Sequence, residues 1–190
     1  MEGIGKIFFL ISILTVIHQT SASDMPSVLI LSQNSWFTFQ SAKKNCMLTD
    51  GQNKDNNGKL VMWGECFTNT KNAWWKAVNS PNDPNHFTLQ NRDSGLCLSV
   101  GTDLTDTGND VRVKQYACQS SRPATQLWSV DIITDDSHQH WIRLKGSGGR
   151  CLSFDPANNE IRGEMYMYDC GCCDRYTNQY FKLDFYGFRD

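Results

Sequence analysis

Three short aromatic segments recur at equal spacing along the 190-residue chain, and this repetition restricts the fold more than any other feature. The segments are AWWKAV, QLWSV and QYFKLD, and their aromatic residues Trp75, Trp128 and Phe181 lie 53 residues apart in both intervals. The side chains of QLWSV alternate between two faces, which is typical of a strand. A repeat of about 50 residues with several strands in each copy predicts one structural unit used three times.

Other segments follow the same order in each copy. A strand-like segment opens the copy (FTFQ, FTLQ or IRLK), a first cysteine segment follows (NCML, LCLSV or RCLSF), and a second cysteine ends an apolar-aromatic strand (LVMWGEC, VRVKQYAC or EMYMYDC). The cysteines thus form three like pairs, Cys46 with Cys66, Cys97 with Cys118 and Cys151 with Cys170. We expect three disulfides, each of which contributes roughly 3 kcal/mol by restricting the unfolded chain.

The first residues of the chain predict the cellular compartment to which the protein is directed. Lys6 precedes an apolar run from Ile7 to Ile17, and the small residues Ser-Ala-Ser follow at 21–23. This pattern is typical of a cleaved signal peptide over residues 1–23, and the run is shorter than the roughly 20 apolar residues that cross a membrane. We therefore expect a secreted, extracellular protein without membrane insertion, whose residues 24–190 form one domain.

Eight cysteines in a secreted chain favour disulfides over metal ligands. The cluster CGCC at 170–173 makes zinc the alternative, but His138-x-His140 is a weak partner for it, and we expect neither a metal nor a cofactor. Cys172 and Cys173 remain after the three pairs. They could form a strained vicinal disulfide, bond to another chain to give an oligomer, or stay reduced, and the sequence does not decide among these.

Charge and motifs exclude several classes of function. A formal net charge of −2 gives no basic surface for nucleic acid. The chain has neither a Gly-x-Ser-x-Gly elbow nor a His-Glu-x-x-His motif, and nothing singles out a pair of carboxylates for glycoside hydrolysis, so we expect no enzyme. Asp135 and Asp136, with His138 nearby, are expected to form a solvated turn.

Turn-rich runs such as TDGQNKDNNG, GTDLTDTGND and GSGG separate the short strands, and no amphipathic helix is evident after residue 23. The repeats cover about 29–80, 81–134 and 135–190. Three copies are too few for an ordinary propeller, whereas a closed all-β barrel with threefold pseudosymmetry buries one shared core and leaves few free strand edges.

These motifs resemble the ricin B-type lectin β-trefoil, whose lobes read roughly Gly-x-Cys-Leu-Asp, then apolar-aromatic-x-Cys, then Gln-x-Trp. The cysteine-rich trefoil domain of mannose-receptor-type proteins is similar too. The resemblance extends from about Leu29 to Phe185 and implies a disulfide-stapled β-trefoil that binds glycans or glycoproteins. It also implies that Trp75, Trp128 and Phe181 pack in the core.

A sugar site needs a flat aromatic ring for stacking and fixed polar groups for the hydroxyls. The resemblance places the ring two residues before the second cysteine, at Tyr116 and Tyr168, with Trp63 three residues before it in the first repeat. The amide of the site would come from Asn72, from Gln126, or from Asn178 with Gln179. Any one of these residues could equally have only a structural role.

The acid of the site departs from the family pattern. Family members that bind galactose usually carry Asp two residues after the first cysteine, where this chain has Leu48, Ser99 and Ser153. Asp50 and Asp155, two residues further on, are the candidate substitutes. The third repeat keeps the fullest set and is the favoured site. The alternative is a secreted trefoil interaction protein that has lost its sugar sites.

Overall fold

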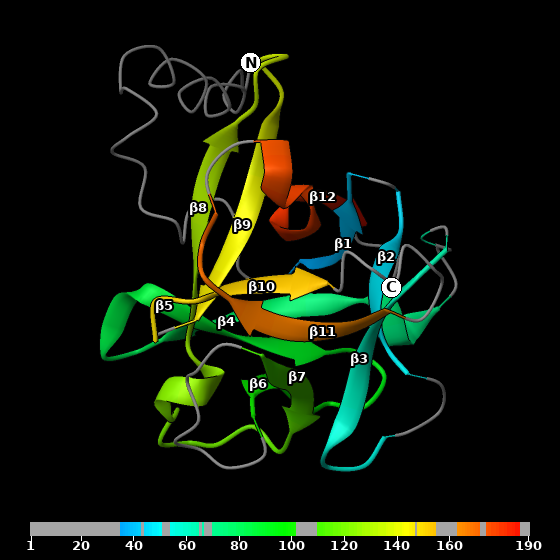
Figure 1. Ribbon diagram of the computed structural model, residues 1–190. Coiled ribbons are helices and arrows are strands. Elements are labelled where there is room, and N and C mark those ends of the chain that lie inside the picture. Colours follow the sequence, from blue (N-terminus) through cyan, green and yellow to red (C-terminus); the bar gives the residue numbers. More distant parts are fainter. Residues whose placement is uncertain are drawn as a thin grey trace, which may run out of the picture.

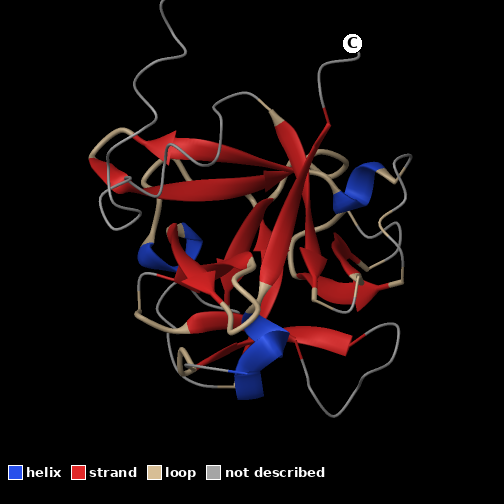
Figure 2. Cartoon of the chain, turned by 90° about the horizontal axis from the view of Figure 1, so that it is seen from above, coloured by secondary structure: helices blue, strands red, loops and turns tan. Residues whose placement is uncertain are grey.

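The computed structural model describes residues 35–42, 44–50, 54–64, 66, 70–101, 110–146, 148–154, 163–171 and 174–186. The expected signal peptide at 1–23, Asp155 and the pair Cys172 and Cys173 lie outside the described residues. Within these ranges the chain forms short strands and three short 3-10 helices, which Figure 2 shows spread around the molecule.

Each repeat contributes four strands, and we call the resulting units lobes one, two and three. Lobe one holds β1 (Trp36–Ser41), β2 (Cys46–Thr49), β3 (Gly58–Trp63) and β4 (Trp75–Ser80). Lobe two holds β5 (Asp83–Asn91), β6 (Cys97–Val100), β7 (Val111–Tyr116) and β8 (Trp128–Thr134). Lobe three holds β9 (His140–Gly146), β10 (Cys151–Phe154), β11 (Gly163–Tyr168) and β12 (Phe181–Tyr186). A 3-10 helix precedes the last strand of each lobe: η2 (Lys71–Ala73), η3 (Ala124–Gln126) and η4 (Asp174–Gln179).

The first and last strands of the lobes form a closed barrel. Antiparallel pairs join β1 to β4, β4 to β5, β5 to β8, β8 to β9, β9 to β12 and β12 back to β1. Closure removes free edges from the barrel sheet. In Figure 1 the β8–β9 hairpin extends well beyond the rest of the barrel.

The two middle strands of each lobe form a hairpin, and the three hairpins close one end of the barrel. β2 pairs with β3, β6 with β7, and β10 with β11. The hairpins also pair with one another, through β3 with β7, β7 with β11 and β11 with β3. This barrel with a three-hairpin cap is the β-trefoil that the sequence predicted, with its three pseudo-symmetric lobes.

The repeated aromatic residues lie at the centre of the core, as the sequence predicted. Trp75, Trp128 and Phe181 have no exposed surface, and each lies opposite an apolar residue of its lobe's first strand, namely Phe37, Phe87 and Ile142. The two indoles are also fixed by hydrogen bonds from Nε1, Trp75 to the Met47 carbonyl at 3.3 Å and Trp128 to the Leu98 carbonyl at 3.1 Å. Their polar N–H groups are therefore satisfied inside the core.

The three expected disulfides are confirmed. They join Cys46 to Cys66, Cys97 to Cys118 and Cys151 to Cys170, with sequence separations of 20, 21 and 19 residues. Each links the start of the second strand of a lobe to the residues that follow its third strand. The disulfides therefore hold the cap hairpins closed.

Three equivalent cap positions, the second residues of β3, β7 and β11, carry two cations and one anion. Lys59 Nζ lies 2.6 Å from Glu164 Oε1, and Arg112 Nε lies 3.0 Å from Glu164 Oε2. Tyr166 also donates its hydroxyl to Glu164, at 3.1 Å. One carboxylate thus pairs with cations from both other lobes.

Candidate functional site

The three candidate platform rings occupy equivalent places in the fold. Trp63, Tyr116 and Tyr168 are the last residues of β3, β7 and β11, and each lies opposite the first cysteine of its lobe. Trp63 therefore matches the two tyrosines although it lies one residue further from its second cysteine. The strand register, rather than the distance to that cysteine, determines the position of the ring.

Exposure distinguishes these rings. Tyr168 is 43% exposed, whereas Trp63 and Tyr116 are half-buried. Burial raises the pKa of the Tyr116 phenol, whose hydroxyl donates to Oδ1 of Asn57 at 2.8 Å. Among the three candidates, Tyr168 offers the most open ring for stacking on a sugar.

The two candidate asparagines have the same arrangement in lobes one and three. Asn72 donates from Nδ2 to the Thr49 carbonyl at 3.0 Å, and Asn178 donates to the Phe154 carbonyl at 2.9 Å. Each bond ties the 3-10 helix to the end of the second strand. In the described part of the chain no donor reaches Oδ1 of either asparagine, so both amide oxygens can accept a hydrogen bond from a hydroxyl. Lobe two has Thr125 at this position, with its side chain buried.

Gln126 and Gln179 are fully buried and bonded to the protein itself. Gln126 accepts from the Gln119 amide at 3.0 Å and donates to the Ala117 carbonyl at 3.0 Å. Gln179 accepts from the Gly171 amide at 3.1 Å and donates to the Asp169 carbonyl and to Ser153 Oγ, both at 2.9 Å. In both lobes the glutamine thus holds the segment around the second cysteine, and in this arrangement it shapes the backbone of the site.

The positions of the family acid point inward in this protein. Leu48 is 9% exposed and Ser99 and Ser153 are each 1% exposed, so none of them presents a group to solvent. Asp50 is exposed directly after β2, where its backbone N–H donates to the Lys59 carbonyl at 2.9 Å. Asp155, the corresponding residue after β10, lies outside the described residues.

Lobe one has an apolar character at its candidate site. Leu48, Val61 and Ala73 form a small buried cluster with Cys46, and Trp63 packs against it. Leu48 and Ala73 stand where the other lobes have Ser and Gln. Of the lobe-one candidates, Asn72 and the exposed Asp50 supply the polar groups.

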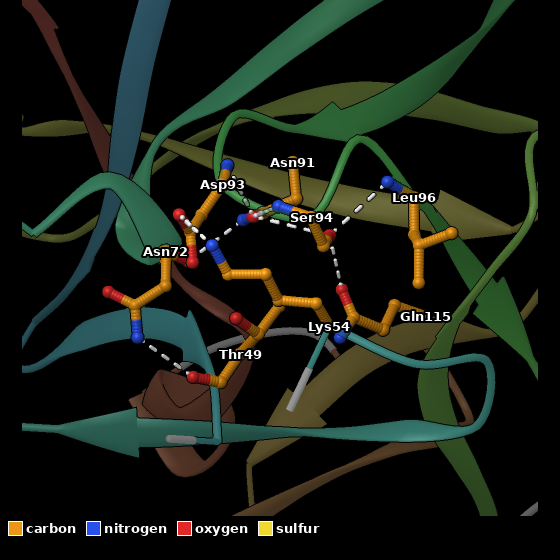
Figure 3. Close-up of polar contacts among 8 residues, drawn as sticks. All are labelled: Thr49, Lys54, Asn72, Asn91, Asp93, Ser94, Leu96 and Gln115. Atoms are coloured by element: carbon orange, nitrogen blue, oxygen red, sulfur yellow. Dashed lines mark hydrogen bonds and ion pairs between the residues drawn. The ribbon is translucent and has the colours of Figure 1, made fainter. Parts of the chain in front are cut away.

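Figure 3 shows a polar network that connects Asn72 to lobe two. The fully buried Asn91 donates to the Asn72 carbonyl at 2.8 Å and accepts from the Asp93 and Ser94 amides at 3.0 and 3.2 Å. Ser94 Oγ then donates to Gln115 Oε1 at 2.7 Å. The network therefore extends from the main-chain carbonyl of Asn72 to Gln115, the residue next to Tyr116.

Two residues of this region were not predicted from the sequence. Gln115 faces the core between lobes, and the alternation of VRVKQY, which places it on the same face as Val113, was the available signal. Asn57 contacts Tyr116 across 59 residues of sequence. The run NNG signalled a turn there but gave no indication of that contact.

No group of three or more His, Cys, Asp or Glu side chains is placed to hold a metal ion among the described residues. No helix in the described part of the chain is long and apolar enough to cross a membrane.

The comparisons with known proteins agree with the β-trefoil fold. The family model described as ricin-type β-trefoil lectin domain-like matches residues 28–116 and 71–163, which together span more than half of the chain. A comparison with curated protein sequences finds no significant match.

Solved structures with this fold are similar at low sequence identity. The designed threefold-symmetric protein ThreeFoil aligns with a TM-score of 0.64 and 16% identity over 78% of this chain and 96% of its own. The ricin B-like lectin of Macrolepiota procera, solved in complex with lactose, aligns with a TM-score of 0.60 and 12% identity over 80% of this chain and 96% of its own. An exo-β-1,3-galactanase from Clostridium thermocellum aligns with a TM-score of 0.67 and 17% identity over 82% of this chain but only 31% of its own.

Proposed function

Because the chain belongs to the family of ricin-type β-trefoil lectin-like domains, we propose that it is a secreted, non-catalytic protein that binds glycans or glycoproteins. The sites are shallow surfaces on its lobes, where a sugar ring stacks on an aromatic side chain and its hydroxyls meet amide groups. The lactose complex of the Macrolepiota procera lectin supports this class of ligand.

Lobe three is the principal site in this proposal, and the exposed ring of Tyr168 is the observation that carries it. Asn178 is fixed through Nδ2, which leaves its oxygen to accept a hydroxyl, and Gln179 holds the backbone beneath. Asp155 is proposed as the acid of this site. Lobe one, with Trp63, Asn72 and Asp50, ranks second.

A single shallow site of this kind binds weakly, at about millimolar Kd or roughly 4 kcal/mol. Useful affinity then requires several lobes or several chains acting on one multivalent surface. An intermolecular disulfide through Cys172 or Cys173 is one proposed route to such an oligomer.

A glycan array with the chain from residue 24 onward, followed by titration of the best ligand, tests the function. We expect Tyr168→Ala to weaken binding at least about tenfold, since it removes the stacking surface. Phe185→Ala is the matched control, because this ring is similarly exposed, at 47%, but lies on barrel strand β12 outside the three candidate sites. If Trp63→Ala abolishes binding and Tyr168→Ala does not, lobe one is the principal site.

The apolar cluster beneath Trp63 favours a second candidate function, a secreted trefoil that binds a protein partner after losing its sugar sites. Leu48 and Ala73 remove two polar positions from lobe one. Absence of any bound glycan on the array would select this alternative.

A further inference from the structure

The platform ring of lobe two is held by a turn that belongs to lobe one. This turn, Asn56–Asn57, directly precedes β3 and reaches the end of β7 in the neighbouring lobe. Asn57 Oδ1 accepts from the Tyr116 hydroxyl at 2.8 Å and from Lys114 Nζ at 2.5 Å. Asn56 Oδ1 accepts from the Ala117 amide at 2.7 Å.

The backbone of the turn reinforces these side-chain contacts. Asn57 has a φ of +72°, a left-handed conformation that asparagine tolerates better than most residues. Its N–H donates to the Gln115 carbonyl at 2.8 Å, directly before Tyr116 in sequence. The turn therefore contacts the backbone on both sides of Tyr116 as well as its hydroxyl.

The corresponding turn of lobe two keeps the backbone contact, but its described residue Asp110 does not repeat the side-chain contact of Asn57. Asp110 has a φ of +60°, and its N–H donates to the Met167 carbonyl at 3.0 Å, directly before Tyr168. Within the described residues the Asp110 carboxylate makes no hydrogen bond, and Tyr168 is more exposed than Tyr116. The backbone contact thus recurs between lobes, whereas Asn57 adds a side-chain contact to the Tyr116 hydroxyl at the junction of lobes one and two.

From these contacts we propose that Asn57 is a positioning residue for the sugar platform Tyr116, so that ligand binding in lobe two depends on a side chain of lobe one. The inference rests on the proposed glycan-binding function. A phenol hydrogen-bonded at its tip cannot swing away, so its face is presented to the ligand without the loss of rotational freedom that a mobile ring incurs on binding.

Two substitutions at Asn57 separate positioning from a general effect on folding. Asn57→Gly keeps the left-handed backbone but removes the acceptor, and Asn57→Asp keeps both. Asp110→Gly is the matched control, because it removes the side chain at the equivalent position of the next turn, where the Asp110 carboxylate makes no hydrogen bond within the described residues.

Binding in each lobe is followed separately by titrating ¹⁵N-labelled protein with the best glycan from the array. The amides of Gln119 and Gly171 hold equivalent places in lobes two and three, since each donates to the glutamine of its own lobe. We expect Asn57→Gly to weaken binding reported by Gln119 about fivefold, the effect of one ordinary hydrogen bond, and to leave the affinity reported by Gly171 unchanged. Asn57→Asp should retain wild-type affinity in lobe two, and Asp110→Gly should retain it in both lobes.

A second readout needs no glycan. The ring signals of Tyr116, identified in ¹³C-tyrosine spectra by their loss in Tyr116→Phe, should shift in Asn57→Gly and stay close to wild type in Asp110→Gly. Unchanged ring signals, or equal loss of affinity in lobes two and three, would overturn the positioning role. Binding at lobe three with none at lobe two in the wild type overturns this inference alone, whereas no binding at either lobe overturns the proposed function and the inference with it.

Discussion

At the scale of single residues, a side chain from another lobe leaves no room for a side chain at position 58, which is Gly58. A Cβ atom on Gly58 would lie 2.4 Å from Nε2 of Gln115, well inside any real contact distance. Gln115 stands where lobes one and three have Met62 and Met167, and it is fully enclosed. Because the Ser94 hydroxyl donates to Oε1 of Gln115, the glutamine side chain cannot shift without losing that hydrogen bond.

We therefore expect Gly58→Ala to lower the free energy of unfolding by about 1–3 kcal/mol, as overpacking of a closed core does. Urea unfolding measures this change. The same substitution in a Gln115→Ala background should have a much smaller effect, because the colliding atoms are gone. An equal loss in both backgrounds would show that the contact is not the cause.

At the scale of elements, the turn between β8 and β9 is organised by one carboxylate. Asp135 Oδ1 accepts from the Ser137 hydroxyl at 2.7 Å and from the Ser137 and Gln139 amides at 3.0 and 2.8 Å, while Oδ2 accepts from Trp141 Nε1 at 2.7 Å. These bonds, led by that from the Ser137 hydroxyl, lower the pKa of Asp135 to about 2 from 3.8. The turn that the sequence predicted as solvated is thus also ordered by a defined set of hydrogen bonds to Asp135.

Since the folded pKa of Asp135 lies below its unfolded value, its stabilisation of the turn is complete above pH 3.8 and disappears as the pH falls through about 2. The indole N–H signal of Trp141 should follow this titration. Asp135→Asn should shift that signal at neutral pH, because one oxygen acceptor is lost. Asp136→Asn, in the exposed neighbour, is the control and should leave it in place.

At the scale of the whole molecule, Glu164 joins the three lobes at the cap. Its hydrogen bond from Lys59 is the largest of several causes that lower its pKa, with Tyr166 and Arg112 adding to the effect. The stability that Glu164 contributes is therefore present above its unfolded pKa of about 4.5 and is lost as the pH falls below it.

We expect Glu164→Gln to reduce Tm by about 2–4 °C at pH 7, since partly exposed ion pairs are worth about 1 kcal/mol or less. The Tm values of variant and wild type should converge as the pH falls below 4.5. Asp184→Asn is the control, because this exposed acid on β12 makes no ion pair within the described residues. A difference in Tm between Glu164→Gln and wild type that is constant with pH would contradict the role of the charge.

The sequence by itself determined the lobes, the disulfides and the buried aromatic residues. Trp128 recurs with its copies at equal spacing because each lobe places one large ring in the shared core, and a core position leaves a periodic trace in sequence. Cys97 and Cys118 could be paired for the same reason. The repeat also predicted one platform ring in each lobe, at Trp63, Tyr116 and Tyr168. These three rings do occupy equivalent strand positions in the structure.

Only the tertiary structure decided which side chains of the candidate sites face solvent and which contact another lobe. Gln126 turns inward because the amide and carbonyl that it bonds are brought to it by a loop, and no spacing in the sequence records that approach. The contact between Asn57 and Tyr116 joins side chains of two different lobes, so it leaves no periodic pattern in the sequence. Repetition in sequence reports what the lobes share, whereas contacts between lobes depend on how the closed barrel and its cap bring unlike residues together.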